Sequence, residues 1–260
     1  MANQSPKSSP PDQESGQKAS ENQPRSPQTQ NRSRRLFWLG LGISVTGGAI
    51  ALGWGAYKLE SSLPESVNPV LTYAREGTVT IESADGAILQ EIGPVTHEKL
   101  KIWEVPELVT QAFIASEDRR FYKHNGVDYQ GVFRATLANL QARDVVEGGS
   151  SITQQLARIT FLNQEVSLWR KLREIRLAQK IENQFDKEVI LERYLNLVYL
   201  GSGAYGVGDA AWLYFGKTVD ELTLPEAAMI AGLAPAPSLY SPFQNEEAAK
   251  QRRNLVLQRM

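Results

Sequence analysis

The sequence contains no cysteine and only two histidines, His97 and His124. The absence of cysteine excludes a disulfide framework and a thiolate zinc site, and two histidines argue against a histidine-built metal site. The formal net charge is -1, so the chain lacks the basic excess with which a general nucleic-acid binder displaces counterions from phosphates. A length of 260 residues allows one sizeable domain with appendages and leaves no room for a second large one.

The amino-terminal part divides into a polar tail and an apolar run. Residues 2–35 are mostly Ser, Pro, Gln, Asn and charged residues, which cannot offset the entropy of ordering by burial. We therefore expect a disordered cytoplasmic tail over residues 1–35. Residues 36–57 carry no charge and, at 1.5 Å per residue, are long enough to cross a hydrocarbon core of about 30 Å. This run predicts one transmembrane anchor.

A cleaved signal peptide is the alternative reading of residues 36–57, but such peptides have a short basic leader and a small-residue cleavage site. Here the far end carries Trp54 and Tyr57, which are typical of interfacial anchors and favour an uncleaved span. Arginines cluster directly before the span, whereas Lys58 stands alone after it. The positive-inside rule then places the amino terminus in the cytoplasm and the rest outside the cytoplasmic membrane.

The remainder of the chain is predicted to be mainly α-helical with a small β element. Residues 58–100 are expected to form a membrane-proximal linker and a β-hairpin, because alternating strands flank the turn pair Asp85-Gly86. Residues 101–260 are expected to form the main domain. There Val105, Leu108, Val109, Ala112 and Phe113 follow the spacing of a buried helical stripe.

Local signals also predict where helices begin and end. Asp186 is expected to be an N-cap, with Phe185 and Ile190 as a hydrophobic staple. Residues 223–226 are expected to form a capping box, and Gly201 to stop a helix.

Glu117 is the first candidate for chemistry. One more turn of the apolar stripe reaches Glu117, so the carboxyl group should be desolvated and its pKa raised towards that of a general acid or base. Taken alone, a run of Glu, Asp and Arg is more often a solvated helix end, and a single histidine such as His124 is more often structural.

The second candidate is the loop from Gly148 to Arg158. Two glycines followed by Ser150 and Ser151 suggest a loop that feeds a helix N-terminus and binds an anion or sugar hydroxyls. The adjacent pair Gln154 and Gln155 suits the amide and hydroxyl groups of a saccharide. A plain N-cap is the competing interpretation.

The third candidate is the group of Arg170, Lys171 and Glu174, which share one face of a predicted helix. An ordinary surface salt-bridge ladder is the competing interpretation. Basic residues outnumber acidic ones from residue 158 to residue 176, which favours a phosphate or pyrophosphate ligand.

Together, and in this order, the three clusters closely resemble the signature motifs of the peptidoglycan glycosyltransferases (glycosyltransferase family 51). These occur as monofunctional transglycosylases and in the N-terminal part of class A penicillin-binding proteins. The resemblance runs from about residue 78 to the end, with further matching motifs at residues 187–201, 203–207, 214–217, 222–228, 235, 240–242 and 252–257.

The resemblance implies a lysozyme-like helical domain with a small membrane-proximal jaw. It implies polymerisation of lipid II into β-1,4 glycan with inversion and release of undecaprenyl pyrophosphate, and inhibition by moenomycin. In this family Glu117 corresponds to the general base. Glu174 corresponds to the second catalytic carboxylate, which assists the donor pyrophosphate directly or through a divalent cation such as Mg²⁺ or Mn²⁺. No organic cofactor is implied.

The resemblance also implies substrate-binding roles. Gln154 would position the donor, and the candidates for the pyrophosphate or the adjoining loop are Arg134, Ser150, Ser151, Arg158, Arg170 and Lys171. Two positions depart from the family pattern: Ser151 replaces the usual Thr, and Arg158-Ile159 replaces the usual Lys-Asn.

The expected partners are lipid II, the growing lipid-linked glycan, membrane lipids, and transpeptidases or other cell-wall synthesis proteins, but no nucleic acid. The chain stops at Met260, so we do not expect penicillin binding from this polypeptide. Two rival functions are a muramidase or lytic transglycosylase, which would need no pyrophosphate site, and a catalytically silent membrane scaffold. Retention of both Glu117 and Glu174 argues against the scaffold.

Overall fold

A computed structural model of the chain describes residues 38, 47–73, 79–86, 88–92, 99–143, 148–163, 165 and 167–260. The chain divides into two units, Met1–Ala56 and Tyr57–Met260. The predicted tail lies outside the described residues, and of the predicted anchor only residues 38 and 47–57 are described, all in helical conformation. Within the described residues, no helix has both the length and the apolar character that crossing a membrane requires.

A small β element lies near the start of the second unit. After the short helix α2 (Pro69–Thr72), strands β1 (Val79–Glu82) and β2 (Ile88–Ile92) pair antiparallel. Gly86 in the turn has φ of 84°, a left-handed conformation that glycine adopts without strain. The predicted hairpin around Asp85-Gly86 is confirmed.

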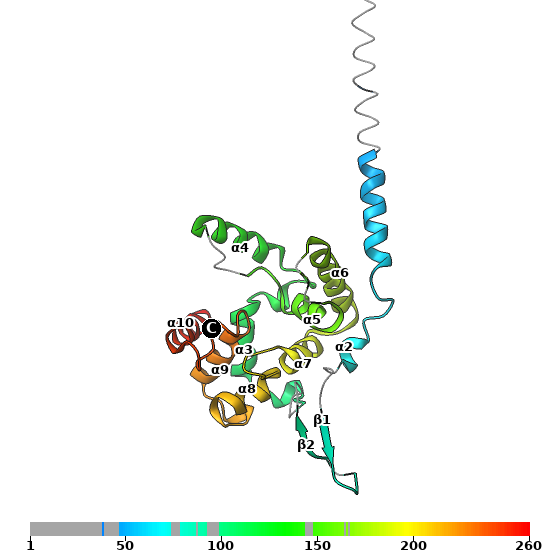
Figure 1. Cartoon of the computed structure of the whole chain (residues 1–260). Helices are drawn as coiled ribbons and strands as arrows, with labels where there is room; N and C mark the ends of the chain where they lie inside the picture. The colour runs from blue at the N-terminus through cyan, green and yellow to red at the C-terminus, as the bar shows by residue number, and fades with distance from the viewer. Residues whose placement is uncertain are drawn as a thin grey trace, which may run out of the picture. The chain divides into compact units, whose positions relative to one another are not determined.

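The rest of the second unit is helical, as Figure 1 shows, and this confirms the mainly α prediction. The α-helices are α3 (Glu107–Glu117), α4 (Tyr129–Ala142), α5 (Ile152–Phe161), α6 (Leu168–Gln184), α7 (Lys187–Leu197), α8 (Gly206–Phe215), α9 (Leu224–Leu233) and α10 (Glu246–Arg259). The described 3-10 turns are η1 (Ile102–Glu104), η2 (Phe121–Lys123) and η3 (Val219–Glu221).

The helices pack in two groups around one apolar core. Helix α3 packs against α9 and α10, while α5 packs against α6 and α7. Phe113 of α3 and Tyr194 of α7 are fully buried and meet edge to face, with 6.2 Å between ring centroids. This contact joins the two groups.

Most of the predicted helix boundaries agree with the structure. The capping box of Thr223 and Glu226 forms at the start of α9, and Ser151 caps α5 in the same manner. Asp186 occupies the N-cap position of α7, but its side chain makes no capping hydrogen bond. The prediction that Gly201 stops a helix is wrong in position, because α7 already ends at Leu197. Gly201 lies in the following turn with φ of 91°.

Candidate active site

A cavity of about 440 Å³ opens where α3, α4, α5 and α10 converge. Six of the residues named as candidates from the sequence line it: Glu117, Arg134, Ser150, Ser151, Gln155 and Arg158. Glu117 ends α3, Arg134 lies on α4, and the other four come from the loop before α5 and from α5 itself. A carboxylate thus faces a cavity with basic and hydroxyl-bearing walls.

Glu117 is the buried carboxylate that the stripe of α3 predicts, with a side chain 7% exposed. Its Oε2 accepts a hydrogen bond from Nε2 of Gln155 at 2.8 Å, and its Oε1 accepts one from Oγ of Ser116 at 3.1 Å. Burial raises the pKa of Glu117 above its ordinary value, whereas the Gln155 hydrogen bond and the Arg252 cation act in the opposite direction. The sequence-based expectation of a raised pKa is confirmed.

Gln155 was expected with Gln154 to suit a saccharide, but its contact with Glu117 was not predicted from the sequence. It lies on α5, where Oε1 of its amide accepts a hydrogen bond from the hydroxyl of the fully buried Tyr194 at 3.2 Å. With its carbonyl oxygen engaged there, the amide directs its NH₂ group at Glu117. The side chain of Gln154, by contrast, accepts a hydrogen bond from the backbone N–H of Ser151 at 2.9 Å and closes the capping box.

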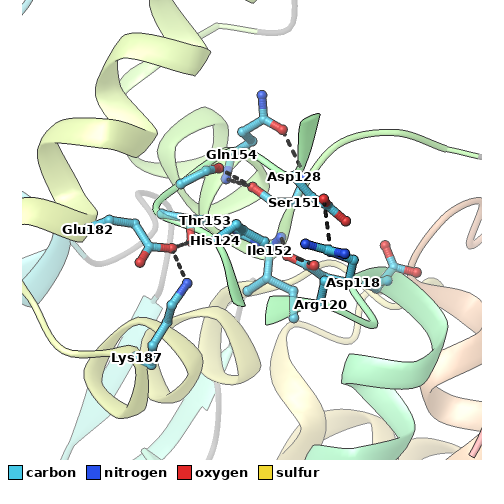
Figure 2. Close-up of polar contacts among 12 residues, drawn as sticks. Asp118, Arg120, His124, Asp128, Ser151, Ile152, Thr153, Gln154, Glu182 and Lys187 are labelled. Carbon is cyan, nitrogen blue, oxygen red and sulfur yellow. Dashed lines mark hydrogen bonds and ion pairs between the residues drawn. The ribbon is translucent and has the colours of Figure 1, made fainter. Parts of the chain in front are cut away.

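Asp118 ties the end of α3 to the beginning of α5 (Figure 2). Its Oδ2 lies 2.9 Å from Nε2 of His124 and accepts the backbone N–H of Ile152, the first residue of α5, at 3.1 Å. A buried carboxylate at a helix N-terminus also interacts favourably with the helix dipole. This contact keeps Gln155 on α5 within reach of Glu117. His124 has a structural role here, as a single histidine more often does.

A second network joins Thr153 of α5 to Glu182 and Lys187 (Figure 2). Oε1 of Glu182 on α6 accepts hydrogen bonds from Thr153 at 2.5 Å and from Nζ of Lys187 at 2.6 Å. The Lys187 ammonium also lies 4.3 Å from the centroid of the Phe121 ring. These contacts join α5, α6 and α7.

Glu174 is fully buried, unlike a member of a surface salt-bridge ladder. Its Oε2 accepts a hydrogen bond from Arg170 at 2.9 Å, and its Oε1 accepts one from Lys171. Nζ of Lys171 also donates to Oγ of Ser150 at 2.7 Å, and Ser150 lines the cavity. Within the described part of the chain, Gln154, Arg170, Lys171 and Glu174 do not themselves line the cavity.

The residues around Glu174 do not fit a protein-held metal ion. Both of its oxygens already face cationic side chains, and divalent cations such as Mg²⁺ favour several oxygen ligands. Among the described residues, no group of three or more His, Cys, Asp or Glu could hold a metal. Metal binding by Glu174 therefore stays a prediction that no contact supports.

Comparison with known proteins places the motifs in a family. Residues 85–260, more than half of the chain, match the family model described as Transglycosylase. The chain belongs to the transglycosylase family. The resemblance to the peptidoglycan glycosyltransferase domain of class A penicillin-binding proteins is thereby confirmed.

Curated relatives carry the same similarity. The chain is 51% identical over 180 residues to Penicillin-binding protein 1A of Aquifex aeolicus, covering 69% of this chain and 25% of that protein. It is 46% identical over 208 residues to Penicillin-binding protein 1A of Escherichia coli, covering 80% of this chain and 24% of the other. The chain thus spans about a quarter of the length of these relatives.

A solved structure is also similar. The crystal structure of Penicillin-Binding Protein 1A from Haemophilus influenzae matches with 28% sequence identity and a TM-score of 0.37, covering 72% of this chain and 18% of that chain.

Proposed function

We propose that this chain polymerises lipid II into β-1,4 glycan strands, with inversion and release of undecaprenyl pyrophosphate. The observation that carries the proposal is the buried carboxylate of Glu117, hydrogen-bonded on both oxygens, in a cavity that Arg134 and Arg158 also line. The transglycosylase family model supports it, and so does the mainly helical fold of residues 101–260.

Glu117 is the general base of the proposed reaction. Its carboxylate takes the proton from the 4-hydroxyl of the acceptor sugar as that oxygen attacks the anomeric carbon of the donor. A raised pKa suits this task, because a stronger base takes the proton more readily provided that it stays ionised at the working pH. A positioned base contributes roughly 10²–10⁴ in rate, so the leaving group needs separate assistance.

The basic side chains provide that assistance in our proposal. Arg134 and Arg158 stabilise the charge that develops on the departing pyrophosphate, because cations already placed beside the cavity need little reorganisation as that charge appears. Glu174 acts through Arg170 and Lys171, whose positions it sets by direct ion pairs. Ser150 connects Lys171 to the cavity.

We further propose that the enzyme works at the outer face of the cytoplasmic membrane, with residues 36–57 as a single-pass anchor and the amino terminus inside. Both substrates carry long lipids, so the site must lie near a bilayer. Apolar side chains exposed on α4 and at the start of α6 suit that surface. The most exposed are Tyr129 and Phe133 at 68%, Leu140 at 75% and Leu168 at 87%. Partners would include transpeptidases.

Polymerisation of labelled lipid II in detergent tests the proposal. We expect moenomycin-sensitive glycan from the unchanged chain and a loss of at least about 10²-fold in rate for Glu117→Gln, the lower end of what a general base contributes. Glu107→Gln is the matched control, because Glu107 lies at the exposed start of the same helix and pairs only locally with Gln111. Equal rates for both variants would overturn the assignment of Glu117.

A further inference from the structure

Helix α10 brings two arginines from the carboxy-terminal end of the chain to the cavity that contains Glu117. Nη2 of Arg252 donates a hydrogen bond to Oγ of Ser116 at 3.1 Å and lies 4.0 Å from Oε1 of Glu117. Nη1 of Arg259 donates to the backbone oxygen of Ser116 at 3.5 Å. The carboxylate of α3 and the guanidinium of α10 are therefore neighbours despite their separation in sequence.

The side chain of Arg252 is held in place by its surroundings. It is only 11% exposed, and its guanidinium lies 5.5 Å from the centroid of the Tyr240 ring. Its stem passes over Gly232 of α9, where a Cβ would lie 3.1 Å from Cγ of Arg252. Its Nε is buried and has no hydrogen-bond partner among the described residues. A guanidinium packed in this way has little freedom to leave Glu117.

The contacts around Glu117 divide between its two oxygens. Oε2 faces the amide of Gln155, while Oε1 faces the hydroxyl of Ser116, which in turn accepts the hydrogen bond from Arg252. A chain of contacts thus leads from the cation through the hydroxyl to the oxygen opposite Gln155.

We propose that Arg252 is a positioning residue for Glu117, which keeps the carboxylate ionised and orients its Oε1 through Ser116. The inference rests on the proposed function of Glu117 as the general base. The physical reason is that a carboxyl group desolvated by burial favours its neutral form, and a neutral Glu117 cannot accept the acceptor's proton. A cation about 4 Å away favours the charged form.

Other titratable and charged groups also lie around Glu117. Burial is the main cause that raises the pKa of Glu117, and the neighbouring Asp118 carboxylate raises it further. Tyr194 of α7 is neutral, because burial and the charge of Glu117 raise its pKa well above 10. Arg134 of α4, Arg158 of α5 and Arg259 of α10 line the cavity. The Arg252 cation lowers the pKa of Glu117.

The decisive variant is Arg252→Gln, with Arg253→Gln as the matched control. Arg253 precedes Asn254 on the same helix and pairs with that amide, so its replacement removes the same charge without touching Ser116. The first measurement is the pKa of Glu117 from its ¹³C carboxyl shift, assigned by comparison with Glu117→Gln. The second is the pH profile of kcat with lipid II.

For Arg252→Gln we expect the pKa of Glu117 and the acid limb of the kcat profile to move together to higher pH. We also expect kcat on the acid side to fall about 10-fold, a part of the roughly 10²–10⁴ that a positioned base contributes. Arg253→Gln should change neither. Arg252→Lys should restore much of the pKa, because it keeps a cation, and less of kcat, because it loses the planar donor group.

Gly232→Ala tests the same contact without changing any charge. The added methyl group would displace the stem of Arg252, so a smaller shift in the same direction is expected. If Arg252→Gln fails to fold, the pKa of Glu117 in Gly232→Ala tests the proposal in its place.

Two results would overturn the proposal. One is an unchanged pKa of Glu117 in Arg252→Gln. The other is a raised KM with an unchanged pH profile, which would make Arg252 a substrate ligand. If the unchanged chain makes no polymer, the proposed function fails, but the carboxyl titration still tests the coupling between Arg252 and Glu117.

Discussion

Replacement of Glu174 by Gln tests whether the buried carboxylate organises the two cations beside it. The substitution keeps the shape of the side chain and removes its charge. Arg170 is 15% exposed and Lys171 is 36% exposed, so both lose their counter-charge while partly shielded from water. Breaking a buried ion pair by removing one partner costs about 3–5 kcal/mol. We expect about 3 kcal/mol, the lower end, because Lys171 can turn towards solvent.

The assay is thermal unfolding of the detergent-solubilised chain, followed by circular dichroism at neutral pH. For a domain of this size, each kcal/mol lowers Tm by about 2–4 °C, so we expect a decrease of roughly 6–12 °C. Glu192→Gln is the matched control. Its partner Lys101 lies 3.5 Å away and is 54% exposed, so the loss should be small.

Metal removal adds a second arm to the same assay. If Glu174 anchors Arg170 and Lys171 and holds no metal, EDTA should leave the Tm of the unchanged chain as it is. A decrease in Tm of less than about 2 °C for Glu174→Gln, corresponding to less than about 1 kcal/mol, would refute the reasoning. A Tm that EDTA lowers in the unchanged chain but not in Glu174→Gln would also refute it. Either result would mean that Arg170 and Lys171 are not held by ion pairs with Glu174 in the way that the contacts indicate.

Two further predictions concern stability. The hydrogen bond from Lys217 lowers the pKa of Glu226 to about 2, so its stabilising contribution is complete above the ordinary value of 4.5 and is lost as the pH falls towards 2. Urea unfolding should therefore show a steeper loss of stability over this range for the unchanged chain than for Glu226→Gln, and identical slopes would contradict it. Gly126→Ala should destabilise the fold strongly, because Gly126 has φ of 86° and a Cβ would lie 2.8 Å from the backbone of α6. Gly148→Ala is the control: a Cβ there would meet nothing within 4 Å, so this variant should unfold nearly like the unchanged chain.

Local features of this fold were predictable because their causes lie within a few residues. The stripe from Val105 to Phe113 predicted α3, and the Asp85-Gly86 pair predicted the hairpin. The predicted capping box at the start of α9 depends on a pair only three residues apart. The end of α7 was misplaced, because the chain turns away at Val198 in an extended conformation before it reaches Gly201.

The candidate site was predictable in part for the same reason. The stripe of α3 alone indicated a desolvated Glu117, and helical spacing alone placed Glu174 beside Arg170 and Lys171. The order of the motifs indicated the family. The periodicity of the sequence could not predict whether these side chains are buried. The same i, i+4 pair forms an exposed salt-bridge ladder or a buried ion pair, depending on which elements pack over it.

The sequence by itself therefore determined the mainly helical class, the stripe of α3, the hairpin, the capping box of α9, the family and the carboxylate that carries the proposed chemistry. Only the tertiary structure decided which polar groups surround that carboxylate. Gln155 reaches Glu117 because Asp118 holds the start of α5, and Arg252 reaches it because α10 folds back onto α3 and α9. These partners are separated along the chain by whole helices, so their meeting depends on how the helices pack, which no local pattern of residues records.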